Sequence, residues 1–538
     1  MRISFKALLA FLVTFAVLLL LHLPLLRLPY HWDEAGYYIP AALDFYRSWL
    51  LIPKTTLPVG HTPLVMVYLG LVWRLFGYSV WAARSAMALI AAATVASLYV
   101  LGRRVASREI AAWSALLLAL SPLFFAQSTL AHLDLTAALF TTLGVLFLLG
   151  DQFWLFALAA SLAVLSKETA VVLLPVVWLY AWRRRRGFAG GRADPLSTWA
   201  ALVAPLVPLA AWALYYHQVT GYWTGNHEYL SYNLYSTLSP ARVFWSLLRR
   251  AYELFIGGFN WLLTACAPVG FWWGRKHGTR DTGHEKRGSE DRRSPAPEPR
   301  ITFHVPRVPS LFSRVTYPVF RIPNFIFLTG GLVAIYLLLL SLVGGAILPR
   351  YLLPVLPLSY LVAVALVTRL PGFPSRLILA AAAACFVWAW FINPPYPFPF
   401  EDNLAYADFI RLHEQAAHFL EAQPGQPRIL TAWPATDELT ELFLGYVRRP
   451  LRVAPVQGFT PRDFANVPPE SFDLLFLYSR QWEPPGNWVA RFPGWLRVQG
   501  RYFNYHQQVA TQALVARYHL RLLAEIEHRG QWVRIYSR

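Results

Sequence analysis

Apolar stretches long enough to cross a lipid bilayer recur through residues 1–393 of this 538-residue chain, and no other feature restricts its fold as strongly. A helix needs about 20 predominantly apolar residues to span the hydrocarbon core, and by this criterion we predict about eleven spans. They lie at residues 5–23, 80–101, 109–127, 133–149, 153–166, 168–182, 198–215, 253–273, 324–347, 351–369 and 375–393. The sequence therefore predicts an α-helical polytopic membrane protein.

The composition agrees with lipid as the solvent. Hydrophobic residues make up 56% of the chain and charged residues 14%, against about 45–50% and about 25% in soluble domains.

The first apolar run follows Arg2 and Lys6 and resembles a signal peptide. Bulky residues follow it, instead of the small pair that signal peptidase needs, so we interpret it as an uncleaved first span. The fifth and sixth spans are short, and residues 166–168 between them are either a loop or a polar break within one long helix.

Arginine-rich loops set the predicted orientation. Basic clusters lie at residues 103–108, 183–186 and 274–323, between apolar spans. A cytoplasmic N-terminus places all three inside the cell, as the positive-inside rule requires for a multi-pass protein of the plasma (inner) membrane. The net charge of +19 is thereby explained without a nucleic-acid partner. Segment 274–323 is expected to be a disordered basic cytoplasmic loop, with a nucleic-acid-binding arm as the alternative.

Two further regions lie outside the spans. In the loop 24–79, residues 35–50 and 63–76 mix aromatic, apolar and charged side chains, which is typical of helices lying in the membrane interface. Residues 394–538 alternate helical and strand patterns, which predicts a small α/β domain, placed on the extracytoplasmic side by the odd number of spans. This domain shows neither a nucleotide fingerprint nor a metal-ligand spacing, so no chemistry is assigned to it.

Two acidic motifs lie at the predicted outer face. Asp33 and Glu34 directly follow the first span, and partial desolvation at the lipid–water boundary would raise the basicity of such carboxylates. The alternative is a solvated pair that only marks the end of the span. Asp134 begins the fourth span, where the helix N-terminus favours an acid. Ser128 or Thr129 would be a more ordinary cap, so Asp134 is free for another role.

Three motifs supply cations or a histidine on the same side. Lys167 lies between two apolar spans, where an ionisable residue is costly and tends to be paired or functional. Arg350, before the tenth span, is anomalous under the positive-inside rule and requires a phosphate or a carboxylate as partner. His61 is either a substrate contact or part of a turn. One membrane orientation places Lys167, Arg350 and His61 at the same outer face as Asp33 and Asp134. At that face, cations could neutralise a lipid phosphate and an acid could deprotonate an acceptor hydroxyl.

The order of the motifs resembles the GT-C glycosyltransferases. The Asp-Glu pair is followed by a His-x-Pro-Leu helix that ends in Leu-Phe-Gly (residues 75–77), and Ala-Arg-Ser (residues 83–85) opens the next span. Residues 166–168 resemble their Thr/Ser-Lys-Gly turn, and residues 350–354 resemble their Arg/His-Tyr-x-x-Pro element. The closest groups are the protein O-mannosyltransferases, the lipid A aminoarabinose transferase and the lipopolysaccharide galacturonosyltransferases. The resemblance covers roughly residues 1–393.

The resemblance implies inverting transfer from a polyprenyl-phosphate sugar donor to a lipid, glycan or protein acceptor, among membrane lipids, at the extracytoplasmic face. Asp33 would be the general base, and Lys167 and Arg350 would hold the phosphate. The expected substrate-binding residues are Glu34, His61, Asp134, Lys167, Glu168, Arg350 and Tyr351. Glu168 and Thr62 depart from the usual Gly and Pro at these motifs, which leaves the donor undefined. Some members use a divalent metal and others do not, and no cluster here predicts a metal site.

Other classes remain as alternatives. A transporter or lipid flippase would show a repeat relating its two halves and ionisable residues near mid-span, whereas here the charges gather at one rim. An O-antigen-ligase-type enzyme would have a very large outer loop between late spans. A purely structural scaffold is the remaining alternative. The sequence does not specify the sugar, the acceptor or the oligomeric state.

Overall fold

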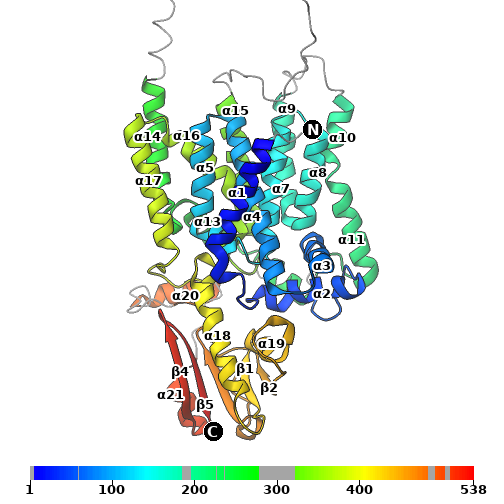
Figure 1. Cartoon of the computed structure of the whole chain (residues 1–538), viewed down its shortest axis with the longest axis vertical. Helices are drawn as coiled ribbons and strands as arrows, with labels where there is room; N and C mark the ends of the chain where they lie inside the picture. Colours follow the sequence, from blue (N-terminus) through cyan, green and yellow to red (C-terminus); the bar gives the residue numbers. More distant parts are fainter. Residues whose placement is uncertain are drawn as a thin grey trace, which may run out of the picture.

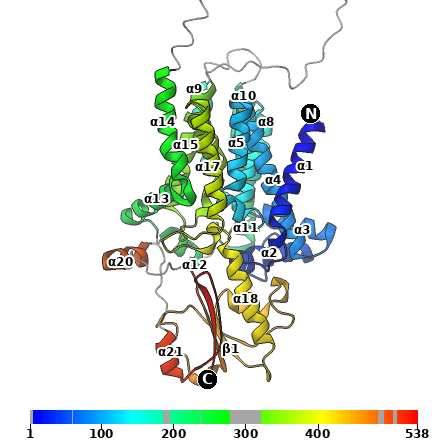
Figure 2. The same ribbon diagram turned by 60° about the vertical axis from the view of Figure 1, so that its left-hand side comes forward.

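The computed structural model describes residues 5–58, 60–184, 195–225, 227–235, 237–277, 321–482, 491–502, 509 and 511–538. Upright helices form a bundle, and a C-terminal sheet domain lies against one end of it, opposite the end that holds the N-terminus (Figures 1 and 2). The helices of the bundle are α1 (Phe5–His22), α4 (Val80–Val105), α5 (Arg108–Leu120), α6 (Pro122–Gln127), α7 (Leu133–Leu148), α8 (Phe153–Ser166), α9 (Leu174–Arg184), α10 (Pro195–Val203), α11 (Leu206–Thr220), α14 (Trp261–His277), α15 (Arg321–Leu342), α16 (Leu356–Val367) and α17 (Gly372–Ala389).

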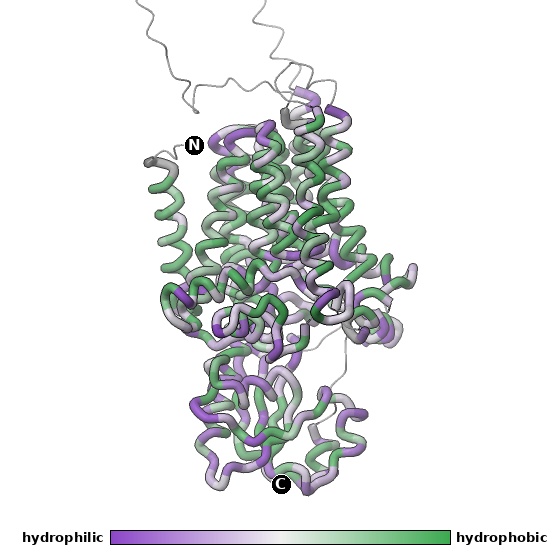
Figure 3. Tube along the Cα trace, turned by 90° about the vertical axis from the view of Figure 1, so that its right-hand side faces the viewer, coloured by the Kyte–Doolittle hydropathy of each residue, from purple (hydrophilic) through white to green (hydrophobic). Residues whose placement is uncertain are grey.

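Every predicted span coincides with helical structure. Five helical stretches in the described part of the chain are long and apolar enough to span a membrane. They are Leu8–Leu25, Val80–Val105, Pro195–Thr220, Asn324–Leu342 and Gly372–Ala389, and shorter apolar helices accompany them. Figure 3 shows hydrophobic residues along the whole bundle and a mixed pattern in the C-terminal domain. The fold is that of a multi-pass membrane protein.

Several predicted spans are interrupted, each for a local reason. Span 109–127 divides into α5 and α6 because the backbone of Ser121 is extended and Pro122 begins a new helix. Span 198–215 divides into α10 and α11 just before Leu206, where Pro205 precedes the second helix. The segment after α8 leaves the helix at Lys167, which is extended, and continues as the 3-10 helix η3 (Glu168–Leu173) into α9. Residues 153–184 are therefore two segments and not one long helix.

The end of the bundle nearest the sheet domain is closed by shorter helices. The π-helix η2 (Glu34–Tyr38) leads into α2 (Ile39–Ser48), and α3 (Leu64–Phe76) lies beside it (Figure 1). The side chains of Leu75 and Phe76 are exposed, as expected for a helix in the membrane interface. A further amphipathic helix, α13 (Pro240–Phe255), was not predicted. The span expected to begin at residue 253 begins at Trp261, because Gly258 adopts a positive φ of 57° and interrupts the helix.

The C-terminal domain contains a five-stranded sheet in the order β2-β1-β3-β5-β4. Its strands are β1 (Ile429–Ala432), β2 (Val453–Val456), β3 (Leu474–Tyr478), β4 (Arg521–His528) and β5 (Gln531–Ser537), and its helices are α18 (Ala405–Glu421), α19 (Ala435–Thr440), α20 (Pro493–Tyr502) and α21 (Thr511–Tyr518). Strand β1 pairs in parallel with β2 and β3, whereas β5 is antiparallel to both of its neighbours. The strand and helix patterns of the sequence predict strands at residues 428–432, 451–456 and 472–478, a hairpin at 518–538 and a helix at 404–422, and the sheet and α18 lie at these positions. Helices α20 and α21 were not predicted.

The predicted disordered loop 274–323 falls mostly on residues 278–320, which lie outside the described residues. Its two ends are helical, because α14 continues to His277 and α15 begins at Arg321.

Candidate active site

Arg350 is the centre of a buried ion-pair network at the end of the bundle that faces the sheet domain. It lies in the 3-10 turn η7 (Pro349–Leu352), which Pro349 begins after the extended residue Leu348. Its guanidinium is almost fully buried. It pairs with the carboxylates of Asp33 and, at 2.6 Å, of Glu401, while its Nε lies 3.8 Å from Asp134. One arginine therefore joins the loop after α1, the start of α7 and the segment before α18.

Lys167 extends this network into the bundle. Its Nζ lies 2.6 Å from Oδ1 of Asp134, and both side chains are buried. The same ammonium lies 3.8 Å from the centre of the Tyr351 ring. The extended backbone at Lys167 allows this geometry, since it ends α8 at the depth where α7 begins. Asp134 thus lies between the two cations, Lys167 and Arg350.

His132 fixes the guanidinium from the other side. Its Nε2 accepts a hydrogen bond from Nη1 of Arg350 at 3.0 Å, because an arginine can only donate. The opposite ring nitrogen, Nδ1, therefore holds the proton and donates to Oε1 of Gln127 at 2.7 Å. Both side chains are fully buried. This chain of hydrogen bonds holds His132 neutral and Arg350 in one orientation.

Asp33 is the most accessible acid of the network. Its side chain is 20% exposed, compared with 2% for Asp134 and 6% for Glu401. It lies at the N-terminus of the π-helix η2, a type of helix that is frequent at functional sites. A substrate that approaches the network from solvent can therefore reach the Asp33 carboxylate more readily than the other two.

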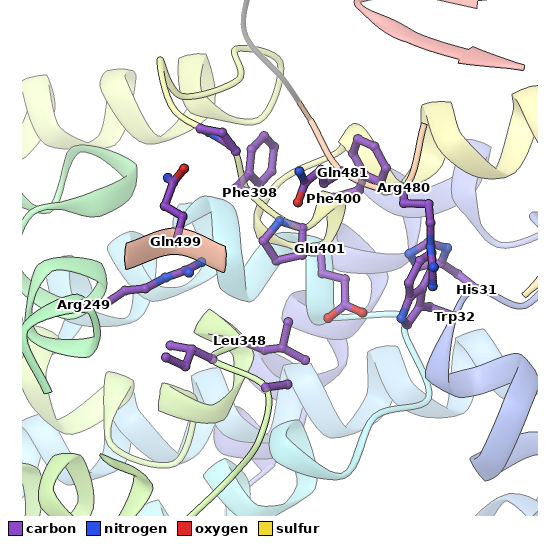
Figure 4. Close-up of a pocket in the computed structure, with 14 residues that line it drawn as sticks. His31, Trp32, Arg249, Leu348, Phe398, Phe400, Glu401, Arg480, Gln481 and Gln499 are labelled. Atoms are coloured by element: carbon purple, nitrogen blue, oxygen red, sulfur yellow. The ribbon is translucent and has the colours of Figure 1, made fainter. Parts of the chain in front are cut away.

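A pocket adjoins this network, between the bundle and the sheet domain. Figure 4 shows Glu401 in the pocket, with Arg249 and Gln499 on one side and with His31, Trp32 and Arg480 on the other. Burial raises the pKa of Glu401 to about 7, against the opposing effect of Arg350, and the negative charge of Asp33 adds to the increase. Glu401 is therefore expected to change its charge near neutral pH.

A second buried arginine has unused donors. Arg250, on α13, is fully buried, and its Nε and Nη1 atoms have no hydrogen-bond partner among the described residues. Only Nη2 is engaged, by the carbonyl of Ala346 at 3.4 Å. The guanidinium lies 5.8 Å from the centre of the Tyr351 ring, the ring that Lys167 also contacts. Glu253, on the same helix, is the nearby acid whose charge acts on Arg250. Buried donors without a partner are costly, so the free Nε and Nη1 atoms are suited to bind an anion.

Two predicted residues lie at the edge of the network. His61 and Glu168 form a pair, with Nδ1 to Oε1 at 3.0 Å, and both remain partly exposed. The ring of Tyr38 lies about midway between His61 and His132, at 6.1 and 6.0 Å from their centres. The carboxylate of Glu168 thus accepts a hydrogen bond from His61 and does not face Lys167 alone.

Glu34 occupies a different position from its neighbour Asp33. Its carboxylate is fully buried and accepts hydrogen bonds from the backbone amides of Ala131, at 2.6 Å, and His31, at 2.9 Å. Arg84 lies 3.3 Å away and also donates to the carbonyls of Leu28 and Pro29. Glu34 and Arg84 therefore tie the loop after α1 to α4 and to the segment before α7.

The sequence analysis missed His132, Arg250 and Glu401 as site residues. Glu401 follows the last span in a Phe-Glu-Asp sequence, so the same position relative to the membrane that singled out Asp33 could have found it. Arg250 was hidden because α13 was not predicted. Among the described residues, no group of three His, Cys, Asp or Glu side chains is arranged to hold a metal ion.

Comparisons with known proteins agree with this architecture. The PMT_2 family model, described as dolichyl-phosphate-mannose-protein mannosyltransferase, matches residues 60–212. The structure of ArnT from Cupriavidus metallidurans bound to undecaprenyl phosphate aligns with a TM-score of 0.56 and 15% identity, over 99% of this chain and 98% of that chain. Its apo state aligns with a TM-score of 0.51 and 15% identity, over 98% of each chain. No curated protein matches. The chain thus has the GT-C fold that its motif order predicted.

Proposed function

We propose that this protein transfers a glycosyl group from a polyprenyl-phosphate-linked sugar to an envelope acceptor at the extracytoplasmic face of the plasma (inner) membrane. The family match over residues 60–212 and the fold shared with ArnT, whose structure holds undecaprenyl phosphate, support this class of reaction. The basic ends of α9 and α14 lie at the end of the bundle opposite the network, as a cytoplasmic N-terminus would require (Figure 1).

The observation on which the proposal depends is that Nε and Nη1 of Arg250, beside Tyr351 and Lys167, have no hydrogen-bond partner among the described residues. A phosphate placed there would accept hydrogen bonds from the unused Nε and Nη1 atoms. Lys167 would add a second positive charge, and the Tyr351 hydroxyl could donate a hydrogen bond. This revises the expected role of Arg350, whose Nη1 and Nη2 atoms are already engaged by Asp33, Glu401 and His132, and whose Nε faces Asp134 at 3.8 Å.

Asp33 is the proposed general base. The acceptor hydroxyl attacks the anomeric carbon from the face opposite the phosphate, so the configuration inverts. Asp33 takes the hydroxyl proton, and the bond between the anomeric carbon and the phosphate oxygen breaks. Polyprenyl phosphate leaves with one more negative charge, which Arg250 and Lys167 stabilise. Arg350 orients the Asp33 carboxylate, and Asp134 orients Lys167.

The remaining predicted residues receive supporting roles. Glu34 positions the loop after α1 through its bonds to Arg84 and two backbone amides. His61 and Glu168 form the partly exposed edge of the site and are placed to contact the sugar or the acceptor. The domain division proposed from the sequence, 1–393 for transfer and 394–538 for the outer domain, is modified in one respect, because Glu401 from the second segment belongs to the network.

Substitution of Arg250 or Lys167 by Ala is expected to weaken binding of undecaprenyl phosphate by about 10- to 100-fold, the loss typical of one charge-assisted phosphate contact. Affinity for the acceptor should change less than twofold, on the order of experimental error for a group that does not contact it. Binding to protein in lipid nanodiscs would measure both. Arg376→Ala is the control, since Arg376 lies on α17 in an exposed pair with Glu109 and does not line the pocket. Equal losses for donor and acceptor would contradict a phosphate contact.

Glu401 should give the reaction a pH dependence near neutrality. Its pKa is raised to about 7, so below pH 7 it is protonated and Arg350 pairs mainly with Asp33, which leaves the Asp33 carboxylate less free to contact the acceptor hydroxyl. Above pH 7 the ionised Glu401 takes a share of the guanidinium and the rate rises. Glu401→Gln should remove this rise from the pH profile of kcat, whereas the exposed Glu441→Gln should keep it. An unchanged profile in Glu401→Gln would contradict this coupling.

The proposed function is tested by comparing a strain that lacks the gene with its parent and with strains complemented by wild type or Arg250→Ala. Mass spectrometry of envelope glycolipids and glycoproteins should show one missing sugar modification, restored by wild type alone. Identical envelopes in all strains, together with no transfer by the purified protein from polyprenyl-phosphate sugars, would exclude the proposal.

A further inference from the structure

We infer that Trp433, on the C-terminal sheet domain, is a positioning residue that holds the Asp33 loop in its reactive conformation. The inference rests on the proposed function, in which Asp33 is the base. It assigns to the sheet domain a part in the reaction that the sequence did not indicate. Trp433 directly follows strand β1 and precedes α19, so it extends from the rigid edge of the sheet.

The backbone around Asp33 adopts an unusual conformation. Trp32 has a positive φ of 47°, a region that bulky residues rarely occupy. The π-helix η2 begins at the next residue but one, and the amide of Gly36 donates to the carbonyl of Trp32 at 3.0 Å. Such a conformation persists only where the surroundings determine it. The packing partners of residues 29–37 therefore decide where the Asp33 carboxylate lies.

Trp433 packs directly against this segment. Its ring lies 5.2 Å from the ring of Trp32 in an edge-to-face arrangement. A Cβ atom on Gly36 would lie only 2.8 Å from Cζ2 of Trp433, so any larger residue at this position would collide with the indole. The Nε1 of Trp433 donates to Asp437 at 3.1 Å, which fixes the ring on the side of the sheet domain. The indole thus fits against Trp32 and Gly36, which lie on either side of Asp33 and Glu34 in the chain.

Other contacts attach the same segment to the same domain. The amide of Tyr30 donates to the carbonyl of Leu444 at 3.2 Å, and the hydroxyl of Tyr446 donates to the carbonyl of Tyr30 at 3.0 Å. The ring of Phe409, on α18, lies 5.1 Å from His31 and 5.9 Å from Trp32. These contacts hold the beginning of the loop, whereas Trp433 meets both Trp32 and Gly36.

Trp433 does not line the pocket beside Glu401, so it acts on the reaction only through the loop. A shift of about 1 Å in a reacting group can reduce a rate by about 100-fold. Loss of the indole should therefore lower kcat and leave donor binding, which depends on Arg250 and Lys167, nearly unchanged. A purely structural role would instead lower the amount of folded protein without changing the kcat of the molecules that remain folded.

The test is a double-mutant cycle between positions 36 and 433, in purified protein reconstituted into nanodiscs. Trp433→Ala and Gly36→Ala should each lower kcat by about 10- to 100-fold, with the Kd for undecaprenyl phosphate changed less than about twofold. Trp433→Phe removes the atom that a Cβ at position 36 would meet. Gly36→Ala combined with Trp433→Phe should therefore recover much of the kcat that Gly36→Ala loses, because contacting residues are not additive. Trp154→Phe, an exposed tryptophan at the start of α8 and at the opposite end of the bundle from the loop, should leave kcat unchanged.

Hydrogen–deuterium exchange of residues 29–37 provides a second readout that does not need activity. Exchange of this segment should accelerate in Trp433→Ala, while exchange of α7 should not. A wild-type kcat in Trp433→Ala, or a double variant whose loss is the product of the two single losses, would overturn the inference. Absence of transfer by the wild type would instead count against the proposed function, and the exchange measurement would still test the contact.

Discussion

Replacement of Asp33 by Asn is expected to lower the rate of glycosyl transfer by about 10²- to 10⁴-fold, the usual contribution of a general base. The two side chains have nearly the same shape, and the amide oxygen can still accept a hydrogen bond from Arg350. The amide cannot take the proton of the acceptor hydroxyl. The variant should therefore insert, fold and bind donor normally. Initial rates of transfer in nanodiscs, together with donor affinity, measure the effect.

Asp151→Asn is the matched control for this substitution. Asp151 lies between α7 and α8, at the opposite end of the bundle, and its pair with Arg184 is partly exposed. A change there is expected to alter neither the rate nor the folding by a measurable amount. Wild-type activity in Asp33→Asn would remove Asp33 as the base and direct attention to Glu401, the carboxylate that lines the adjoining pocket.

The membrane fold was predictable because bilayer thickness imposes a length on every span. Apolar runs of that length mark α1, α4, α7 and α15 with an error of a few residues. An interruption of a helix, such as the one at Pro122, depends on the backbone conformation of a few residues. A hydropathy value averaged over a whole span does not detect it. Helix α13 escaped prediction for the same reason, since its apolar residues occupy one face and its arginines the other.

The candidate site was predictable only in part. Asp33, Asp134, Lys167 and Arg350 interrupt apolar sequence, and charge next to a span is a visible signal. Their partners are not visible in that way. Which carboxylate pairs with Arg350 depends on the packing of the segment before α18 against the bundle, a contact between residues far apart in the chain. The same holds for Trp433 and Gly36, whose proximity no sequence pattern indicates.

The two buried arginines differ in role because their N–H groups have different hydrogen-bond partners. Arg350 is surrounded by acids and His132, so its charge is used within the protein. Arg250 has unused donors and adjoins the ring that Lys167 contacts. Arg350 positions the carboxylates, whereas Arg250 remains available to bind a ligand. Substitution of Arg350 should therefore affect stability, whereas substitution of Arg250 should affect donor binding.

Arg350→Met is expected to destabilise the protein by about 3–5 kcal/mol, the usual cost of removing one partner from a buried ion pair. Asp33, Asp134 and Glu401 would then lie close together, and Lys167 would remain as the partner of Asp134 alone. Arg350→Lys should lose less, because an ammonium keeps the charge but offers fewer donors. Thermal unfolding in detergent or nanodiscs would rank the three proteins as wild type, Arg350→Lys and Arg350→Met.

Combining Arg350→Met with Glu401→Gln shows how much of the stability lost in Arg350→Met comes from repulsion between the remaining acids and how much from lost packing. The second change removes one of the acids that Arg350 leaves behind, so the double variant should be more stable than Arg350→Met alone. Arg376→Met is the control, since its pair with Glu109 is exposed and is expected to contribute less than about 1 kcal/mol. If Arg350→Met were as stable as wild type, Asp33, Asp134 and Glu401 would have to be stabilised by shared protons and not by the arginine. The ion-pair network would then not hold the Asp33 carboxylate, and its role as the base would lose its structural support.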